Sequence, residues 1–280
     1  MEKAIKRYFP IFVLPTMIAF TLGFIIPFVE GVYLSFCKFT TVNDAKFVGF
    51  SNYAKVFTDD TFVHAFWYTA AFTVVSVILI NVLAFAVALL LTKGFKGTNI
   101  FRTVFFMPNL IGGIVLGYIW QLLLNGILMN FSRTLTYSAT FGFWGLMILM
   151  CWQQIGYMMI IYIAGIQNIP SELIEAAEID GATRWQILRK VTIPMVMPSI
   201  TVCTFLTLTN SFKLFDQNLA LTNGEPSKMS EMLALNIYNT FYGRTGYEGV
   251  GQAKAVIFFI LVAAIALTQN YLTRRKEVQQ

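Results

Sequence analysis

Hydrophobic residues are concentrated in six long runs that polar segments separate. A helix of roughly 20 residues covers about 30 Å of hydrocarbon, and each run has about that length. A helix also satisfies its own backbone hydrogen bonds, which hydrocarbon requires. The pattern therefore predicts six membrane-spanning helices in a single all-α domain over residues 1–280. The predicted spans are about 11–35, 69–92, 103–124, 143–166, 194–214 and 254–273.

The first run follows the basic start MEKAIKRYFP, which is also typical of a signal peptide. The run is too long for the apolar part of such a signal, it contains Pro15 and Pro27, and it lacks a small-residue cleavage site. We therefore expect it to be retained as the first membrane helix.

Composition supports a membrane protein and argues against an enzyme. Of the 280 residues, 57% are hydrophobic and 12% are charged, whereas a soluble domain has roughly 25% charged residues. His64 is the only histidine, and the three cysteines are too widely spaced to indicate a disulfide framework or a metal site. The phosphate-binding motif G-x-x-x-x-G-K-[ST] does not occur, so we expect no cofactor in this chain and no ATP binding by it.

The distribution of Lys and Arg predicts the orientation. If both termini are cytoplasmic, the inner segments hold 12 of the 20 bases against six acids, and the outer segments hold eight of each. Cytoplasmic segments carry an excess of Lys and Arg, so this topology is favoured. It accounts for the net charge of +6 without a nucleic-acid partner. The outer segments, about 36–68 and 215–253, are long enough to dock another protein.

A polar segment, PSELIEAAEIDGATRWQILRKVTIPMVMP, separates the fourth and fifth runs at residues 170–198. Ser171 is expected to cap a first short helix, and Gly181 to end it in a left-handed conformation. Thr183 and Gln186 have the spacing of a capping box for a second helix, and Pro194 suits the first turn of the next span. The segment thus predicts a cytoplasmic helix–turn–helix, either a plain amphipathic connector or a docking element for a partner.

The same segment resembles a motif of known transporters. Glu175-Ala176-Ala177, Gly181 and the run Val191–Pro194 match the E-A-A-x3-G-x9-I-x-L-P loop of ABC importer permeases, with Val191 and Ile193 as apolar replacements. The stretches GFSNYAKVF, FRTVFFMPNLIGGIVLGYIW and FDQNLALTNGEP resemble the carbohydrate-uptake branch, mostly its maltose-type first subunit and also glycerol-phosphate permeases. The resemblance implies the type I importer permease fold, with six transmembrane helices and a cytoplasmic coupling helix.

The resemblance also implies partners and a location. We expect a second, different permease chain, ABC ATPase subunits that bind ATP and Mg, an extracytoplasmic solute-binding protein and membrane lipid. The chain would lie in the cytoplasmic membrane of a bacterium or archaeon. The residues implied in contact with the ATPase are Glu175, Ala176, Ala177, Asp180, Gly181, Ala182 and Pro194.

Polar residues inside the predicted spans are candidates for the solute pathway, because such groups face a cavity or other protein. Amide and hydroxyl groups beside aromatic rings suit a sugar. We predict that the pathway is lined by Gln153, Gln154, Tyr157, Asn210 and Ser211. The alternative is hydrogen bonding between helices, which we prefer for Thr204, Thr207 and Asn81. Gly112 and Gly113 favour close helix packing, and Lys213 and Asp216 favour a local ion pair.

These features predict a permease subunit for a sugar or oligosaccharide. A glycerol-phosphate or polyol importer subunit is the alternative. An ion-coupled secondary transporter would be expected to carry acids within its spans, and the middle of these spans has none. A membrane scaffold or receptor would leave the spacing of the polar segment unexplained.

Overall fold

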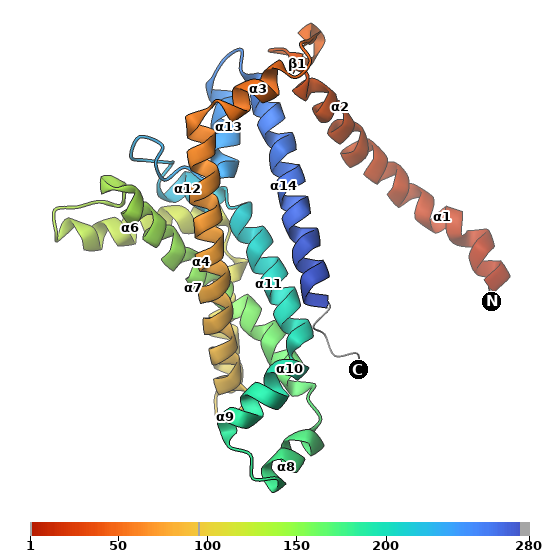
Figure 1. The fold of residues 1–280 in the computed structure, drawn as a ribbon, viewed down its shortest axis with the longest axis vertical. Helices are drawn as coiled ribbons and strands as arrows, with labels where there is room; N and C mark the ends of the chain where they lie inside the picture. Colours follow the sequence, from red (N-terminus) through yellow and green to blue (C-terminus); the bar gives the residue numbers. More distant parts are fainter. Residues whose placement is uncertain (1, 95, 275–280) are drawn as a thin grey trace. The chain divides into compact units, whose positions relative to one another are not determined.

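A computed structural model describes residues 2–94 and 96–274 of the chain. The chain forms two compact units, one of residues 1–60 with 237–260 and one of residues 61–236 with 261–280. Helices make up most of the described part (Figure 1). The predicted all-α class is confirmed.

The first unit begins with an almost continuous helical stretch. It consists of α1 (Glu2–Phe20), the π-helical turn η1 (Thr21–Ile25) and α2 (Ile26–Ser35). A hairpin follows, in which β1 (Cys37–Lys38) pairs antiparallel with β2 (Lys46–Phe47) around the 3₁₀ turn η2 (Val42–Asp44). The backbone N–H groups of Thr40 and Thr41 donate to the carboxylate of Asp44 and lower its pKa. The helix α3 (Ser51–Phe57) completes the N-terminal part, and parts of α13 (Leu233–Gly243) and α14 (Glu248–Arg274) also belong to this unit.

A buried charge lies in this unit. Lys254 on α14 is fully buried, and its Nζ lies 2.8 Å from Oδ2 of Asp59. The same ammonium group donates to Oγ1 of Thr240 on α13 at 2.8 Å, and the guanidinium of Arg244 lies 4.0 Å from Asp59. Because a buried charge is tolerated only when it is paired and hydrogen-bonded, this cluster links α14 to α13 and to Asp59 within the first unit.

The second unit contains most of the long helices and the segment between them. In chain order it holds most of α4 (Asp60–Leu91), then α5 (Thr98–Phe106), η3 (Met107–Leu110), α6 (Gly113–Met129), η4 (Leu135–Tyr137), α7 (Ala139–Gln167), α8 (Ser171–Ile179), α9 (Arg184–Ile187), η5 (Leu188–Thr192), α10 (Ile193–Met195), α11 (Met197–Phe212) and α12 (Asp216–Leu221). The N-terminal end of α13 and the C-terminal end of α14 also belong to it.

Helix α7 is the most buried long helix of the second unit. Its side chains Leu146, Met150, Met158 and Tyr162 are almost completely inaccessible, and they form the core with residues of α4 and α11. Gly156 faces the backbone of α5 so closely that a methyl group there would overlap the carbonyl of Phe105. The sequence therefore places small and flexible side chains where helices approach α7.

Four of the six predicted runs fall in continuous helices that are long and apolar enough to cross a membrane. These helices cover Ile11–Ser35, Asp60–Leu91, Ala139–Gln167 and Glu248–Gln269. The first helix matches the predicted run 11–35 at both ends, and the other three differ from their apolar runs by one to nine residues at each end.

The other two predicted runs, 103–124 and 194–214, are not single straight helices. Thr98–Leu110 meets Gly113–Met129 at 102°, and Arg184–Met195 meets Met197–Phe212 at 69°. At the first break Pro108 has no N–H to donate, and Gly112 has an extended backbone with φ −62° and ψ 142°. At the second break Val196 leaves the helical region, so Pro194 lies in α10 before the bend. The expectation that Pro194 opens the span is wrong, and Pro198 occupies that position in α11.

The buried cluster predicts a large effect of a single substitution. Lys254→Met is expected to destabilise the protein by about 3–5 kcal/mol, because it leaves the carboxylate of Asp59 without its buried partner. The midpoint of thermal unfolding in detergent measures the change. Lys46→Met, on the exposed strand β2, is the matched control and should leave the midpoint nearly unchanged. The double variant Asp59→Leu/Lys254→Met should recover most of the loss; an equally unstable double variant would contradict this account.

Candidate functional site

The polar segment forms two short helices joined by a tight turn. Helix α8 ends at Ile179, and Gly181 follows with φ +75°. The N–H of Ala182 donates to the carbonyl of Ala177, and that of Gly181 donates to the carbonyl of Glu178. These two bonds form a Schellman motif, which needs a left-handed residue at the position of Gly181. The predicted conformation of Gly181 is confirmed.

The second short helix begins with the predicted capping box. Oε1 of Gln186 accepts from the N–H of Thr183 at 2.7 Å, and Oγ1 of Thr183 accepts from the N–H of Gln186 at 3.4 Å. The prediction for Ser171 is wrong. Ser171 is already the first helical residue of α8, Pro170 occupies the cap position, and no side chain caps this end.

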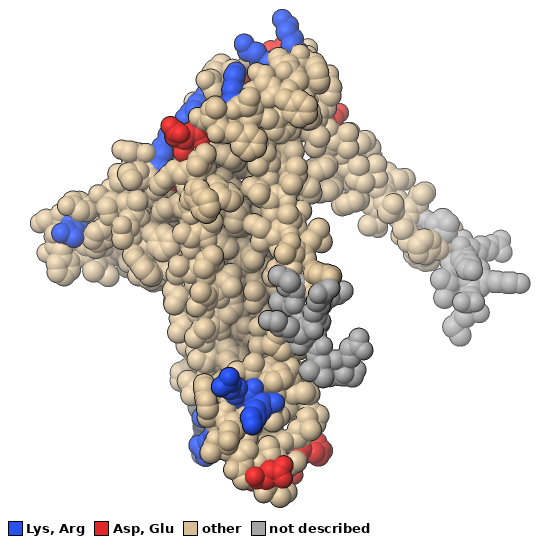
Figure 2. Space-filling view, in the orientation of Figure 1, with Lys and Arg blue, Asp and Glu red and all other residues tan. Residues whose placement is uncertain are grey.

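Charge is segregated along this segment. Four exposed acids on and just after α8 precede three exposed bases on α9 and η5, and Figure 2 shows the acidic and basic side chains as separate patches. The acids are Glu172, Glu175, Glu178 and Asp180, and the bases are Arg184, Arg189 and Lys190. Within the described residues no ion pair at 4.0 Å or less joins the two groups. The acids are therefore available to an external cation.

Apolar side chains of the segment also remain uncovered. Ile179 is 87% exposed and Trp185 is 67% exposed. Ala176 is exposed, and Ala177, Ala182 and Pro194 are half-buried. Large exposed apolar groups beside unpaired acids are typical of a surface that another protein covers.

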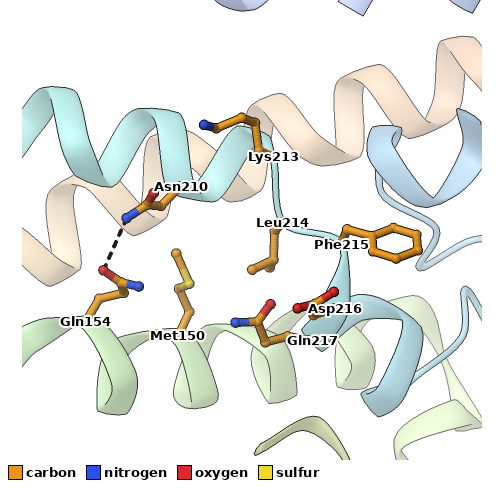
Figure 3. A pocket seen from close by; sticks show the side chains of 8 residues that line it. All are labelled: Met150, Gln154, Asn210, Lys213, Leu214, Phe215, Asp216 and Gln217. Atoms are coloured by element: carbon orange, nitrogen blue, oxygen red, sulfur yellow. Dashed lines mark hydrogen bonds between the residues drawn. The ribbon is translucent and has the colours of Figure 1, made fainter. Parts of the chain in front are cut away.

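A pocket of about 300 Å³ lies at the C-terminal end of α11 (Figure 3). Gln154 from α7 and Asn210 from α11 line one side of it, and Nδ2 of Asn210 donates to Oε1 of Gln154 at 3.4 Å. The other lining residues are Met150, Lys213, Leu214, Phe215, Asp216 and Gln217. Residues with amide, aromatic and charged side chains therefore line one space.

The structure separates the five predicted pathway residues. Gln154 and Asn210 line the pocket. Gln153 is not among the lining residues: its Nε2 donates to the carbonyl of Ile111 at 3.4 Å, and its Oε1 accepts from Nε2 of Gln217 at 2.8 Å. Tyr157 is half-buried, and the centroid of its ring lies 6.4 Å from that of Phe106. Ser211 is fully buried. The hydroxyl of Ser211 has no hydrogen-bond partner among the described residues.

Asn81 and Thr207 form interhelical hydrogen bonds, as expected, whereas the expectation for Thr204 is wrong, because its side chain makes no hydrogen bond among the described residues. Asn81 on α4 accepts from the hydroxyl of Tyr162 on α7 at 2.7 Å and donates to Oγ1 of Thr207 on α11 at 3.3 Å. Gly113 fits against Asp216 and Gln217, where a methyl group would come within 2.7 Å of Cβ of Asp216. Gly112 has open space around it, so close packing is confirmed only for Gly113.

Two features of the pocket differ from expectation. The predicted pair of Lys213 and Asp216 is wrong, because no ion pair within 4.0 Å joins them among the described residues. Both are exposed and line the pocket separately. Gln217 was not predicted, because it lies in the short helix α12 beyond the apolar run. Its sequence signal is the polar start of that helix, Asp216-Gln217-Asn218, directly after a span.

Comparisons with known proteins place the chain among transport proteins. The family described as "binding-protein-dependent transport system inner membrane component" matches residues 80–278. A probable starch degradation products transport system permease of Thermoanaerobacterium thermosulfurigenes is 42% identical over 96% of this chain and 94% of that protein. A multiple sugar-binding transport system permease of Streptococcus mutans is 29% identical over 99% of each chain.

The fold is similar to one seen in a solved transporter. A bacterial alginate ABC transporter, in complex with an alginate pentasaccharide-bound periplasmic protein, contains a chain that matches with a TM-score of 0.81. That match covers 98% of this chain and 97% of the other at 21% identity, so it shows a common fold.

The bonds of Gln153 predict a structural cost for its loss. Gln153→Leu is expected to destabilise the protein by about 1–3 kcal/mol, because the carbonyl of Ile111 and the amide of Gln217 lose a buried partner. Thermal unfolding in detergent measures the effect. Gln154→Leu is the matched control and should cost less, since it loses only the 3.4 Å bond to Asn210. A larger loss at Gln154 than at Gln153 would contradict this assignment.

Proposed function

The chain belongs to the family of binding-protein-dependent transport system inner membrane components, and we propose that it is the permease subunit of an ATP-driven importer of sugars or oligosaccharides. The observation that carries the proposal is the 42% identity, over nearly the full length of both chains, to a permease for starch degradation products. The chain supplies a pathway and a coupling surface, and the work of transport comes from ATP hydrolysis in partner subunits that bind ATP and Mg.

The α8–α9 segment is the proposed contact with an ATPase subunit. Glu175 is exposed and free of ion pairs among the described residues, so it is available to a basic group of the partner. Exposed ion pairs contribute little free energy, so the role of this contact is to set the register. The small side chains Ala176 and Ala177 permit close approach, and the exposed Ile179 and Trp185 supply apolar area.

The proposal includes further partners, which membership of the family supports. A second, different permease chain would complete the pathway, and an extracytoplasmic solute-binding protein would deliver the sugar to the outer segments 36–68 and 215–253. This arrangement requires both termini in the cytoplasm, as the distribution of basic residues predicts. A bacterial or archaeal cytoplasmic membrane is the proposed location.

The pocket at the end of α11 is the proposed place of sugar contact in this chain. Gln154, Asn210 and Gln217 present amide donors and acceptors, which suit hydroxyl groups. Phe215 and Met150 present apolar surface, which suits the C–H faces of a sugar ring. Asn210 and Gln154 bond to each other at 3.4 Å, a long bond that a sugar hydroxyl can replace with little loss. Gln153 is proposed to position Gln217 and not to touch the solute.

Uptake by reconstituted vesicles tests the proposed function. Vesicles that contain this chain with its copurifying permease and ATPase should accumulate an oligosaccharide only when ATP and the solute-binding protein are present. An imposed proton or sodium gradient without ATP should give no accumulation. Uptake driven by the ion gradient alone would identify a secondary transporter and contradict the proposal. A solute panel that includes a glycerol phosphate ester separates the sugar importer from its polyol alternative.

The turn at Gly181 predicts a specific loss of coupling. An alanine at φ +75° is strained by roughly 1–2 kcal/mol, so Gly181→Ala is expected to shift or loosen the start of α9 while the spans still insert. ATP-driven uptake should fall by about tenfold, the factor that corresponds to such an energy. Gly126→Ala is the matched control, because Gly126 lies within helix α6 with open space around it.

Two measurements distinguish a loss of coupling in Gly181→Ala from a loss of membrane insertion. The amount of Gly181→Ala protein in the membrane should equal that of the wild type, and the amount of copurified ATPase or the uptake per ATP hydrolysed should fall. Unchanged coupling in Gly181→Ala would show that this turn does not position the contact with the ATPase.

A further inference from the structure

A second pocket, of about 340 Å³, lies in the second unit away from the proposed sugar pocket. It is formed where α4 ends, α5 begins and α7 ends. Leu91 and Thr92 come from the end of α4, Gln167 is the last residue of α7, and the range 98–102 contributes Thr98, Asn99, Ile100 and Arg102. None of the described lining residues is acidic.

Arg102 supplies an uncompensated positive charge to this pocket. Its Nε atom is buried and has no hydrogen-bond partner among the described residues. No carboxylate within that part of the chain lies within 4.0 Å of its guanidinium. A buried donor on a cation is costly unless an acceptor satisfies it, so the pocket is suited to an acceptor that the chain itself does not supply.

The backbone around the pocket adds to this positive potential. Gly94 and Gly97, which line it, have φ of +72° and +93°, and Gly97 is the cap residue of the nine-residue helix α5. No side chain caps this end of α5, so the positive end of the helix dipole faces the turn. Lys93 and Lys96 on the same turn are both exposed. The N-terminal end of α5, together with cations beside it, favours an anion.

The surroundings indicate which anion fits. A guanidinium and a phosphate form two parallel hydrogen bonds, and Thr92, Asn99 and Gln167 offer further hydrogen-bonding groups around the same space. The pocket lies at the end of the 32-residue apolar helix α4, and Ile100 beside it is 69% exposed. A basic pocket with an exposed apolar flank at the end of a membrane helix has the chemistry of a site for an anionic lipid headgroup.

We propose that this pocket binds a phosphate group through Arg102. The phosphodiester of an anionic phospholipid and a soluble phosphate share this chemistry. The site is independent of the sugar pathway, because the residues that line the two pockets do not overlap.

Native mass spectrometry of the full-length chain tests the proposal and separates the two sources. One arm uses the chain released from nanodiscs of phosphatidylcholine with phosphatidylglycerol, and the other uses phosphatidylcholine nanodiscs with added inorganic phosphate. Arg102→Gln should reduce the retained phosphatidylglycerol, or the retained phosphate, by about tenfold, the effect of losing a charge-assisted hydrogen-bond pair. Arg102→Lys should retain part of the binding, since it keeps the charge and loses the paired geometry.

Arg133→Gln is the matched control. Arg133 lies outside the pocket, where its guanidinium stacks on Tyr137 and Phe141, so the same substitution there should leave binding unchanged. Loss of phosphatidylglycerol in Arg102→Gln identifies a lipid site, and loss only in the phosphate arm identifies a soluble phosphate. Retention equal to the wild type in both arms overturns the proposal.

The wild type alone provides a test that does not depend on the folding of a variant. Phosphate should raise its thermal unfolding midpoint in phosphatidylcholine nanodiscs relative to chloride at equal ionic strength, or phosphatidylglycerol should raise it relative to phosphatidylcholine. No stabilisation by either phosphate source would also overturn the proposal.

Discussion

The structure depends on one constraint: a backbone group that a helix break releases in an apolar chain has to find a partner within the protein. At the break after η3 the carbonyl of Ile111 accepts from the side chain of Gln153. At the turn after α8 the Schellman bonds of Gly181 and Ala182 satisfy the free carbonyls. At the bend of Val196 the backbone bonds continue, because its N–H donates to Thr192 and its carbonyl accepts from Ile200. At these three breaks the change of chain direction coincides with such a partner.

The same constraint organises the wall of the proposed sugar pocket. Gln153 uses one end of its amide for the broken helix and the other for Gln217, so the break between η3 and α6 also orients a pocket residue. Helix α12 comes close enough for this contact because Gly113 and Gly117 of α6 leave room for it. Gln153 therefore has a structural role, whereas its neighbour Gln154 lines the pocket.

The features that could be predicted from the sequence are those that depend on residues close together in the chain. The apolar runs, the left-handed Gly181 and the capping box at Thr183 depend on residues within a few positions. The structure contains the turn and the capping box, and four of the six runs lie in continuous helices while the other two are bent. The 102° bend depends on whether α7 offers a partner to Ile111, and the burial of Lys254 depends on Asp59, nearly 200 residues earlier. The Lys213–Asp216 spacing predicted a pair, but Lys213 ends α11 and Asp216 begins α12, so helical spacing does not apply across them.

The order of the elements gives the proposed coupling a continuous physical path. Backbone hydrogen bonds run from the capping box at Thr183 through η5 and α10, and the N–H of Ile200 donates to the carbonyl of Val196 across the 69° bend to α11. One end of this path carries the exposed α8–α9 surface, and the other carries Asn210, which bonds to Gln154 on α7. A displacement of the α8–α9 segment therefore acts on α11 through a hydrogen-bonded helix and not through a flexible loop. The contact that it reaches is the long bond of 3.4 Å between Asn210 and Gln154, which is similar in length to the 3.3 Å bond that Thr207 of α11 accepts from Asn81 of α4. Tyr162 of α7 donates to the same Asn81 at 2.7 Å, so α11 is joined to α7 directly at the pocket and through α4 further along the helix.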